Sequence, residues 1–546
     1  MVNGSQILAR SLRRHHLDTF FYIMGGPMIA AEAACIEEGL RAIDVRHEQA
    51  GVMMAHAYGR LLNTVGVCMA ASGPGVMNLV TGVAHAWADS APLLAIGGAS
   101  PLSQAGKGAF QEVDQVSVFK PITKWAERCT EPKKIPEMVS LAIRQALSGR
   151  PAPVYLDMPG DVLYREVDES EVDYPDPERS VVRARPYGDP TLVSQAIRQL
   201  QQAERPIVIT GSGIFWSEAE AELQRFVERA GLPFYTTPTG RGALPDDHRL
   251  SLPAARATAF READLLLVIG TRINYVISHL AAPRFGADAK LVQVDIEASE
   301  IGHNRPADVG IVGDARAVLQ QLLDAADQSP KLDAGRFAAW VDHLRDVHER
   351  KTAEQEVAMS TDQVPIHPLR LCKEVRDFLD RDAVLVVDGQ EILNYGRQSI
   401  PTYVARHRMN SGVFGTMGVG LPFGIGAKLA KPDTQVLVLH GDGSFGLNAM
   451  ELDTAARHKI PVVTAISLNG GWTADPQGTK PGRNLGYTAF HKMAEALGCH
   501  GEYVEDPAAI RPALERAYAS GCPAVVNVVT DHRARATTAP YSHYLT

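Results

Sequence analysis

Short apolar runs alternate with longer stretches of helical period along most of the chain. The runs lie at 65–71, 206–210, 264–269, 291–295, 383–387, 435–440 and 462–468. Continuous apolar runs of this length are typical of strands buried on both faces of a parallel sheet, and the helical stretches between them would cover those faces. The pattern predicts an α/β protein built from doubly wound parallel sheets.

Two segments interrupt this alternation. Residues 167–190 mix acidic residues, arginines and prolines, and residues 351–368 are mainly polar. Because such segments usually connect domains, we expect three doubly wound domains of ordinary size. They would span 1–170, 188–345 and 366–530.

The overall charge excludes one class of partner. The 546 residues include 54 Lys and Arg against 63 Asp and Glu, a formal net charge of −9. This balance argues against sequence-independent binding to nucleic acid or to an anionic membrane surface. The six cysteines are too widely spaced for a disulfide framework or a metal pair, and no run reaches the roughly 18 apolar residues of a membrane span.

The N-terminal region contains one segment that is similar to a signal peptide. A basic run at 13–16 precedes an apolar stretch, but Gly25, Gly26 and Pro27 interrupt that stretch. The interruption favours a strand, a tight loop and a helix over a continuous apolar region. We therefore expect a multidomain cytoplasmic enzyme.

The third domain contains the strongest local motif. The strand QVLVLH leads into GDGSFG and a helix, and the next strand, VVTAISL, ends at Asn469. In a parallel βαβ unit this places Asp442 and Asn469 at the carboxyl ends of adjacent strands, where Mg²⁺ and a diphosphate can bind. Gly441 and Gly443 would let a phosphate approach the backbone closely. The alternative is an ordinary strand-to-helix turn with Asp as a cap.

The first domain carries a second motif. Arg46, His47, Glu48 and Gln49 open a helix, and the strand VGVCMAA ends in the turn SGPGVMN at 72–78. Taken alone, a Glu in the first helical turn is usually a partner of the helix dipole.

Together the two motifs resemble the thiamine diphosphate enzymes of the pyruvate oxidase and acetolactate synthase type. The resemblance covers nearly the whole chain, including DQVSVFKPITKW, PVYLDMPGDV and GTMGVGLPFGIGA. It implies a pyrimidine-binding domain, a central Rossmann-like domain and a diphosphate-binding domain. It also implies an active site between two subunits, and therefore at least a homodimer, which we expect to pair into a dimer of dimers.

The resemblance implies the residues that hold the metal and the diphosphate. It assigns Asp442, Asn469 and the backbone carbonyl of Gly471 to Mg²⁺. The remaining diphosphate-binding residues would be Gly441, Gly443 and Ser444. This chain has Leu468 where relatives commonly have a first asparagine, but the ligand position is the second.

The resemblance also implies how the cofactor is activated. Glu48 of the neighbouring subunit would bond N1′ of the aminopyrimidine, which favours the imino form that removes the C2 proton. Met417 would prop the cofactor in its bent conformation, and the Gly415 carbonyl would accept from the 4′-amine. Without the resemblance, a Met at this position is more often plain core.

The middle domain points to one branch of the family. Gly211, Ser212 and Gly213 follow a strand, but the third Gly of a dinucleotide fingerprint is missing, so the motif is weak evidence for NAD or FAD. ARATAFREADLLLVIGTRINYVI and VDIEASEIG resemble the acyl-CoA branch, oxalyl-CoA decarboxylase and 2-hydroxyacyl-CoA lyase. In that branch the domain can hold ADP, with Asp295 bonding the ribose. A vestigial fold without ligand is the alternative.

The segment GAFQEVDQ resembles the lyases. Phe110 and Gln111 stand where the decarboxylases have a tyrosine and a glutamate, and Gln111 can orient a substrate but cannot act as a base. Gly26 would leave room where decarboxylases carry a bulkier residue. Trp472 and Thr473 would line the same pocket. Simple packing is the alternative for each.

Coenzyme A requires local cations in a chain of net negative charge. Arg406 and Arg408 precede the cofactor segment, and Arg533 and Arg535 lie in the tail at 531–546. Solvated surface charge is the alternative reading of each. The tail offers little apolar surface, and its end, SHYLT, resembles the lyases. We expect it to be mobile alone and to close as a lid over bound acyl-CoA.

These observations predict a thiamine diphosphate- and Mg²⁺-dependent carbon–carbon lyase. It would cleave a 2-hydroxyacyl-CoA to formyl-CoA and an aldehyde or ketone. The enzymatic alternatives are oxalyl-CoA decarboxylase and a flavin-containing acetolactate synthase. A catalytically silent relative that binds ADP is the alternative from another class.

Overall fold

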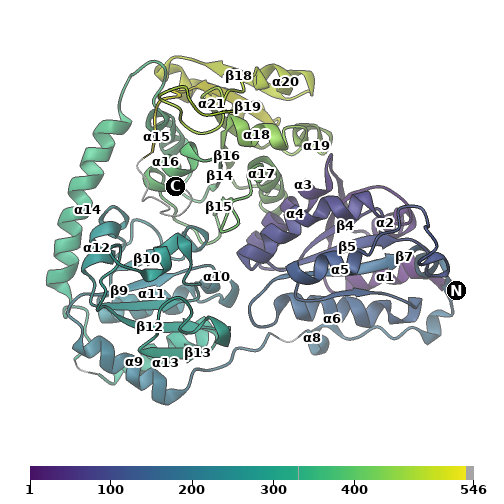
Figure 1. The fold of residues 1–546 in the computed structure, drawn as a ribbon, viewed down its shortest axis with the longest axis horizontal. Coiled ribbons are helices and arrows are strands. Elements are labelled where there is room, and N and C mark those ends of the chain that lie inside the picture. Colours follow the sequence, from purple (N-terminus) through teal and green to yellow (C-terminus); the bar gives the residue numbers. More distant parts are fainter. Residues whose placement is uncertain (182, 330, 537–546) are drawn as a thin grey trace.

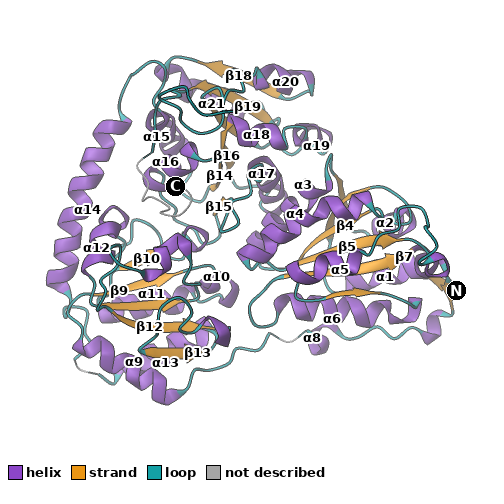
Figure 2. Ribbon diagram, in the orientation of Figure 1, coloured by secondary structure: helices purple, strands orange, loops and turns teal. Residues whose placement is uncertain are grey.

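The computed structural model describes residues 1–181, 183–329 and 331–536. Three parallel sheets lie in three α/β domains, each covered by helices on both faces (Figures 1 and 2). Central strands such as β5 (Leu93–Ala99) and β11 (Leu265–Ile269) are buried along their whole length, as continuous apolar runs predict. The predicted fold class is confirmed.

The N-terminal domain has a six-stranded sheet of order β3-β2-β4-β5-β7-β6. Besides β5, its strands are β2 (Thr19–Ile23), β3 (Arg41–Asp44), β4 (Gly66–Ala70), β6 (Ala126–Arg128) and β7 (Pro153–Pro159), and β1 (Val2–Asn3) pairs with β8 (Glu166–Val167). The helices are α1 (Gly4–Arg14), α2 (Ile29–Glu37), α3 (Glu48–Leu62), α4 (Pro74–Asp89), α5 (Gln115–Phe119), α6 (Ile135–Leu147), α7 (Gly160–Tyr164) and α8 (Pro177–Ser180).

The middle domain has a five-stranded sheet of order β10-β9-β11-β12-β13. Its other strands are β9 (Pro206–Thr210), β10 (Phe234–Thr236), β12 (Lys290–Asp295) and β13 (Val309–Val312). Its helices are α9 (Pro190–Gln202), α10 (Gly213–Ser217), α11 (Glu220–Ala230), α12 (Arg256–Glu262) and α13 (Ala315–Asp327).

The C-terminal domain has a six-stranded sheet of order β15-β14-β16-β17-β19-β18. The strands are β14 (Val384–Asp388), β15 (Arg408–Asn410), β16 (Val436–Gly441), β17 (Val463–Leu468), β18 (His500–Val504) and β19 (Ala524–Val529). The helices are α15 (Pro368–Phe378), α16 (Glu391–Ser399), α17 (Gly420–Ala430), α18 (Asp442–Leu447), α19 (Glu451–Arg457), α20 (Phe490–Ala496) and α21 (Ile510–Ala519).

Each sheet reverses its strand order beside its first strand, between β2 and β4, between β9 and β11, and between β14 and β16. The two six-stranded sheets reverse it again at the far edge, where β6 lies outside β7 and β18 lies outside β19. Crevices at the carboxyl ends of strands beside such a reversal are where open α/β sheets bind ligands. The reversal beside the first strand therefore offers a ligand position in each domain.

The N- and C-terminal domains share one hydrophobic core. Helices α3 and α17 pack directly on each other, and Val52 and Met54 belong to the same buried cluster as Phe423 and Ile425. The two helices lie so close that a Cβ at Gly426 would lie 2.3 Å from the carbonyl oxygen of Met54. The middle domain has a core of its own.

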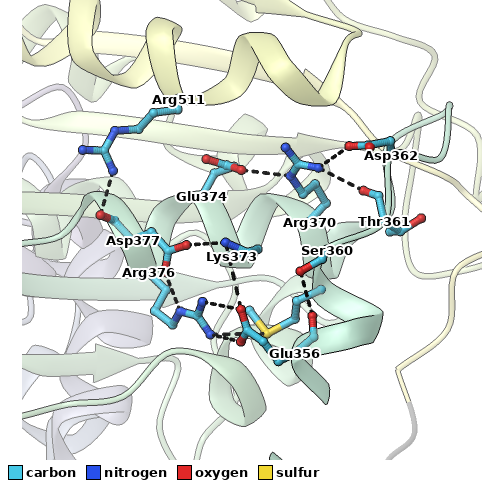
Figure 3. Close-up of polar contacts among 11 residues, drawn as sticks. Glu356, Ser360, Thr361, Asp362, Arg370, Lys373, Glu374, Arg376, Asp377 and Arg511 are labelled. Atoms are coloured by element: carbon cyan, nitrogen blue, oxygen red, sulfur yellow. Dashed lines mark hydrogen bonds and ion pairs between the residues drawn. The ribbon is translucent and has the colours of Figure 1, made fainter. Parts of the chain in front are cut away.

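The second predicted connection is shorter than expected. Residues up to Met359 continue the long helix α14 (Ala338–Met359), which runs along the outer edge of the molecule in Figure 1. The boundary predicted at 345 thus lies inside this helix. Ion pairs between α14 and α15 hold its end, among them Arg376 with Glu356 at 2.6 Å (Figure 3). The Glu, Lys, Gln and Ala residues of this segment favour a helix. They do not form the apolar helical period from which the sequence analysis predicted helices, so the segment was predicted to be a connection.

No helix in the described part of the chain is long and apolar enough to cross a membrane.

Candidate cofactor and active site

Two oxygen ligands lie at one edge of the C-terminal sheet. Strands β16 and β17 are parallel neighbours, with Gly441 opposite Ser467, so Asp442 and Asn469 follow at the same edge. The Asp442 carboxylate accepts a hydrogen bond from the N–H of Gly471 at 3.0 Å, and the Asn469 side-chain oxygen accepts from the same N–H at 3.2 Å. The structure brings together the three residues that the resemblance assigned to Mg²⁺.

The donors at this edge suit a magnesium ion. Carboxylate, amide and main-chain carbonyl oxygens are the hard ligands that Mg²⁺ prefers. Burial raises the pKa of Asp442 to about 6, and a divalent ion beside the carboxylate would offset that desolvation. Asp442, Asn469 and the Gly471 carbonyl would hold the ion, and a diphosphate would complete its coordination.

The turn at 441–444 leaves mainly backbone groups for a phosphate. The hydroxyl of Ser444 bonds the Gly441 carbonyl at 3.0 Å and Nδ1 of His440 at 2.9 Å, so its main-chain N–H is the group available to the diphosphate. The ring of Trp472 packs on Gly443, where a Cβ would lie 2.6 Å from the ring. Trp472 therefore supports the diphosphate turn, a contact that the substrate-pocket prediction did not include.

The two parts of the N-terminal motif, the segment 46–49 and the turn 72–78, meet at the carboxylate of Glu48. Glu48 begins α3 and is 8% exposed. Its Oε2 accepts a hydrogen bond from the Asn78 side chain at 3.0 Å, and its Oε1 lies against Gly75. Glu48 thus has a specific hydrogen-bond partner on α4, which a carboxylate that only balances a helix dipole does not need. A fixed carboxylate of this kind is what binding to a ligand requires.

A residue that the sequence analysis missed fixes the start of α3. The carboxylate of Glu451, on α19, accepts from the N–H groups of Arg46 at 3.2 Å and His47 at 3.0 Å, and from the Thr454 hydroxyl at 2.7 Å. Burial raises the pKa of Glu451 to about 7. The C-terminal domain thus holds the segment that presents Glu48. Nothing in the sequence indicated this role, because Glu451 is simply a Glu in the first turn of its helix.

The predicted substrate residues Gly26 and Gln111 are linked through Ser72. The Ser72 hydroxyl lies 2.7 Å from the Gln111 side-chain oxygen and 3.2 Å from the Gly26 carbonyl. A Cβ at Gly26 would meet nothing within 4 Å, so the space expected there exists. Phe110 is 84% exposed and reaches outward from this group.

Residues 412–418, here called the cofactor loop, carry Gly415 and Met417. Met417 is 40% exposed, so its side chain is not ordinary core. The end of the loop is tied to its own domain, because Oδ2 of the buried Asp388 accepts from the N–H groups of Gly418 at 2.8 Å and Gly420 at 2.9 Å. Asp388 ends β14 beside the strand reversal, a position that the sequence analysis did not single out.

Glu391, at the start of α16, was also missed. It accepts hydrogen bonds from the Thr473 hydroxyl at 3.1 Å and from the N–H of Ala536 at 2.9 Å. It therefore joins the predicted pocket residue Thr473 to the beginning of the tail. Its position just beyond the end of the strand VLVVD was the one available signal.

The arginine assignments need correction. Arg408 is 1% exposed and donates to the carbonyls of Gly396 at 2.8 Å and Ile400 at 3.4 Å, so it cannot reach a CoA phosphate. Arg406 donates to the Phe215 carbonyl and lies 3.5 Å from Glu220, joining the C-terminal and middle domains. Both arginines are engaged by structural partners, which are distant in sequence for Arg406 and lie 8 and 12 positions before Arg408.

The tail is described only as far as Ala536. Arg533 is exposed and lies 3.1 Å from Asp531, and Arg535 is exposed. Their assignment to phosphates stays a prediction. The last ten residues, which include the segment SHYLT, lie outside the described residues.

A cavity lies at the carboxyl edge of the middle sheet. The space between protein atoms there is about 1450 Å³ when the open solvent at its mouth is included. Asp295 ends β12 in its wall, and its Oδ1 accepts from the Glu297 N–H at 2.9 Å. Burial raises the pKa of Asp295 to about 6. Other lining residues are Ser212, Gly213, Arg150, Arg183, Arg185 and Arg272.

Comparisons with known proteins agree with this arrangement. Models of the thiamine pyrophosphate enzymes match 2–118 (N-terminal TPP binding domain), 193–322 (central domain) and 393–528 (C-terminal TPP binding domain). A 2-hydroxyacyl-CoA lyase of Arabidopsis thaliana is 34% identical over 99% of this chain and 98% of its own. An acetolactate synthase large subunit of Mycobacterium tuberculosis is 32% identical over 97% of this chain and 96% of its own. The oxalyl-CoA decarboxylase of Escherichia coli is 32% identical over 97% and 95%. Matches of this length, in the domain order that the structure shows, mean that the chain belongs to the thiamine pyrophosphate (thiamine diphosphate) enzyme family.

Proposed function

We propose that the protein is a thiamine diphosphate- and Mg²⁺-dependent lyase that cleaves a 2-hydroxyacyl-CoA to formyl-CoA and an aldehyde or ketone. The observation that carries the proposal is the group Gly26, Ser72 and Gln111, which combines open space with a neutral amide beside the turn that supports Glu48. Similarity to 2-hydroxyacyl-CoA lyases along almost the whole chain supports the same choice.

The residues divide the chemical work. Thiamine diphosphate, when bound, supplies a carbon nucleophile and an electron sink. Glu48 would hold a proton at N1′ of the aminopyrimidine, and Asn78 fixes the carboxylate for that task. Gln111 would orient the substrate hydroxyl through its amide, without taking the proton. In the overall reaction the hydroxyl proton leaves as the carbon–carbon bond breaks, and the carbon of the thioester gains a proton to become formyl.

The test is a comparison of substrates. The purified enzyme with thiamine diphosphate and Mg²⁺ is incubated with 2-hydroxyacyl-CoAs, oxalyl-CoA and pyruvate, and the products are identified by mass spectrometry. We expect formyl-CoA and a carbonyl product from the 2-hydroxyacyl-CoAs. Dominant CO₂ release from oxalyl-CoA, or acetolactate from pyruvate, would overturn the proposal.

Gly26 provides a sharper test of the pocket. Because a Cβ at Gly26 would meet nothing within 4 Å, Gly26→Val should fold normally. It should lower kcat/KM by roughly tenfold for substrates that release a ketone, and less for those that release an aldehyde, because the added methyl groups fill the space beside the carbinol carbon. Ala33→Val, on the exposed face of α2, is the matched control. An equal effect on both substrate types would argue against this role of Gly26.

We propose a homodimer as the smallest active unit, which pairs into a dimer of dimers. Large apolar side chains on both half-sites point outward, with Phe110 84%, Phe414 54% and Met417 40% exposed. Covering them with a second copy removes apolar surface from water. Light scattering after size exclusion should give a dimer or tetramer, and an active monomer would contradict this.

We also propose that the middle-domain cavity binds ADP. Asp295 at the strand end suits ribose hydroxyls, and arginines in the wall suit a diphosphate. Calorimetric titration should detect ADP binding that Asp295→Asn weakens by about tenfold or more, whereas Asp288→Asn, an exposed control, should not change it. Retained flavin, or no binding of ADP, would overturn this assignment.

A further inference from the structure

Three buried polar side chains lie beneath the cofactor loop. His56 comes from α3, and His85 and Asp89 come from α4, and they are 2%, 0% and 7% exposed. The two helices begin with the segments that hold Glu48 and Asn78. None of the three buried groups acts on the substrate or on thiamine diphosphate in the function proposed above, although Asp89 also lines the middle-domain cavity.

Two of these side chains bind the cofactor loop directly. Nδ1 of His85 lies 3.1 Å from the hydroxyl of Thr416, and Oδ1 of Asp89 accepts from the N–H of Val413 at 3.1 Å. The loop passes so close that a Cβ at Gly412 would lie 2.0 Å from Oδ1 of Asp89. Gly412 also has a φ of +57°, a conformation that glycine adopts without strain.

The buried groups form a connected set. Nε2 of His85 lies 3.4 Å from Oδ2 of Asp89, and the ring of His56 packs against those of His85 and Phe423 with centroids 5.4 Å and 5.0 Å away. The pairing with His85 and the hydrogen bond from the Val413 N–H hold the pKa of Asp89 well below its usual range, so the carboxylate is ionised. Burial lowers the pKa of His56 to about 3, so His56 is neutral and packs as an aromatic ring.

The loop is therefore tied at two ends by different domains. Asp388 and Asn448 of the C-terminal domain hold Gly418 through its N–H at 2.8 Å and its carbonyl at 2.8 Å. Asp89 and His85 of the N-terminal domain hold Val413 and Thr416. Gly415 and Met417 lie between these attachments.

We propose that His85 and Asp89 are positioning residues that fix the cofactor loop, so that Gly415 and Met417 meet thiamine diphosphate in one conformation. The inference rests on the proposed function for the role of the loop. The same two helices also present Glu48 and Asn78. In a homodimer with shared active sites, this contact links the pyrimidine-binding part of one site to the loop of the other.

The first test removes one hydrogen-bonding group without changing shape. Thr416→Val deletes the hydroxyl that faces His85, and Thr416→Ser keeps it. Thr464→Val is the matched control, because Thr464 is fully buried in the same domain and its hydroxyl has no partner among the described residues. Asp89→Asn is the second variant, with thermal unfolding measured to show that it folds.

The readouts separate this proposal from the proposed function. Hydrogen exchange of the peptide covering 412–418, measured by mass spectrometry without cofactor or substrate, should become about tenfold faster in Thr416→Val and Asp89→Asn. Exchange of the C2 proton of bound thiamine diphosphate should slow by about tenfold in the same variants, because a misplaced cofactor reacts poorly. With an acyl-CoA substrate, kcat should fall while KM stays within about twofold.

Thr416→Ser and Thr464→Val should match the wild type in all three measurements. Unchanged hydrogen exchange in both folded test variants would overturn the proposal even if the enzyme cleaves 2-hydroxyacyl-CoA. Faster exchange of the loop would sustain it even if the substrate class proved different. Stoichiometric zinc or another transition metal in the purified enzyme would also overturn it, since His56, His85 and Asp89 would then be metal ligands.

Discussion

Two buried glutamates of the N-terminal domain differ in their surroundings. Glu48 is 8% exposed and has Asn78 as a partner, whereas Glu32 is 3% exposed and neither of its carboxylate oxygens has one among the described residues. Burial alone raises the pKa of Glu32 to about 8, so Glu32 is mostly neutral at pH 7. The same residue type therefore has a specific hydrogen-bond partner at one position and carries a pH-dependent cost in stability at another.

The first prediction concerns Glu48→Gln. The variant should retain thiamine diphosphate, because the expected diphosphate anchor is in another domain. Exchange of the C2 proton should slow by roughly 100-fold or more, the scale of a lost acid–base partner. NMR of acid-quenched samples in D₂O measures that exchange. Wild-type exchange rates in the variant would show that Glu48 does not act on the aminopyrimidine.

The second prediction concerns the stability of the fold against pH. The pKa of Glu32 rises from 4.5 to about 8 on folding, so its stabilising contribution is fully present below pH 4.5 and is lost as the pH rises towards 8. Relative to Glu32→Gln, the wild type should lose stability with increasing pH, with a limiting slope of about 1.4 kcal/mol per pH unit. Thermal unfolding of both proteins at several values between about pH 6 and about pH 8 checks this. Parallel curves for the two proteins would refute it.

At the scale of elements, the expected chemistry lies where strands end. Asp388 ends β14, Asp442 follows β16, Asn469 follows β17 and Asp295 ends β12. Carboxyl ends of parallel strands point to one edge, so groups far apart in sequence meet there. The short helix α18 begins directly at Asp442, which places the carboxylate at the diphosphate turn.

The third prediction concerns this edge. Asp442→Ala should abolish Mg²⁺-dependent retention of thiamine diphosphate, because it removes the charged protein ligand that faces the ion. Asp433→Ala, at an exposed position just before β16, is the control and should bind normally. Gel filtration followed by quantification of bound cofactor measures retention. Stoichiometric cofactor in Asp442→Ala would mean that the metal site lies elsewhere.

At the scale of the whole molecule, the start of the tail is attached to the C-terminal domain. The N–H of Asp531 donates to the Ile366 carbonyl at 2.9 Å, and the His532 carbonyl accepts from the N–H of Asp475 at 3.1 Å. Ala536 is 5% exposed and bonds Glu391. The expectation of a mobile tail is therefore wrong for residues 531–536. They lead past the Thr473 segment towards the last ten residues.

The fourth prediction separates the two parts of the tail. A chain that ends at Ala536 should keep its fold and its affinity for thiamine diphosphate, but should show a higher KM for acyl-CoA and a lower kcat, because closure over the substrate is lost. A chain that ends at Thr530 should in addition lose about 1 kcal/mol or more of stability with the Glu391 bond and the buried Ala536. Steady-state kinetics and thermal unfolding distinguish the two. Wild-type kinetics in the chain that ends at Ala536 would exclude a lid.

The sequence by itself determined the fold class and the residues at strand ends. Apolar runs and helical period are local properties, so they predicted three parallel-sheet domains without knowledge of how the domains pack. The motif GDG followed by Asn469 placed two oxygen ligands at one edge, because strand direction alone decides where strand ends lie. Glu48 and SGPGVMN were linked only through the family resemblance, and the structure joins them through Asn78.

Tertiary structure decided which polar side chains are available. The residues beside Arg408 do not reveal its burial, because the carbonyls that it binds belong to Gly396 and Ile400, 12 and 8 positions earlier in the chain. The contacts of Glu451 with Arg46, of Glu391 with Ala536 and of His85 with Thr416 join residues 145 to 405 positions apart. A charge or a hydroxyl has the same local signature whether it faces solvent, a ligand or a buried partner. Only the packing of the domains settles which of these it meets, because burial and hydrogen-bond partners depend on distant chain segments.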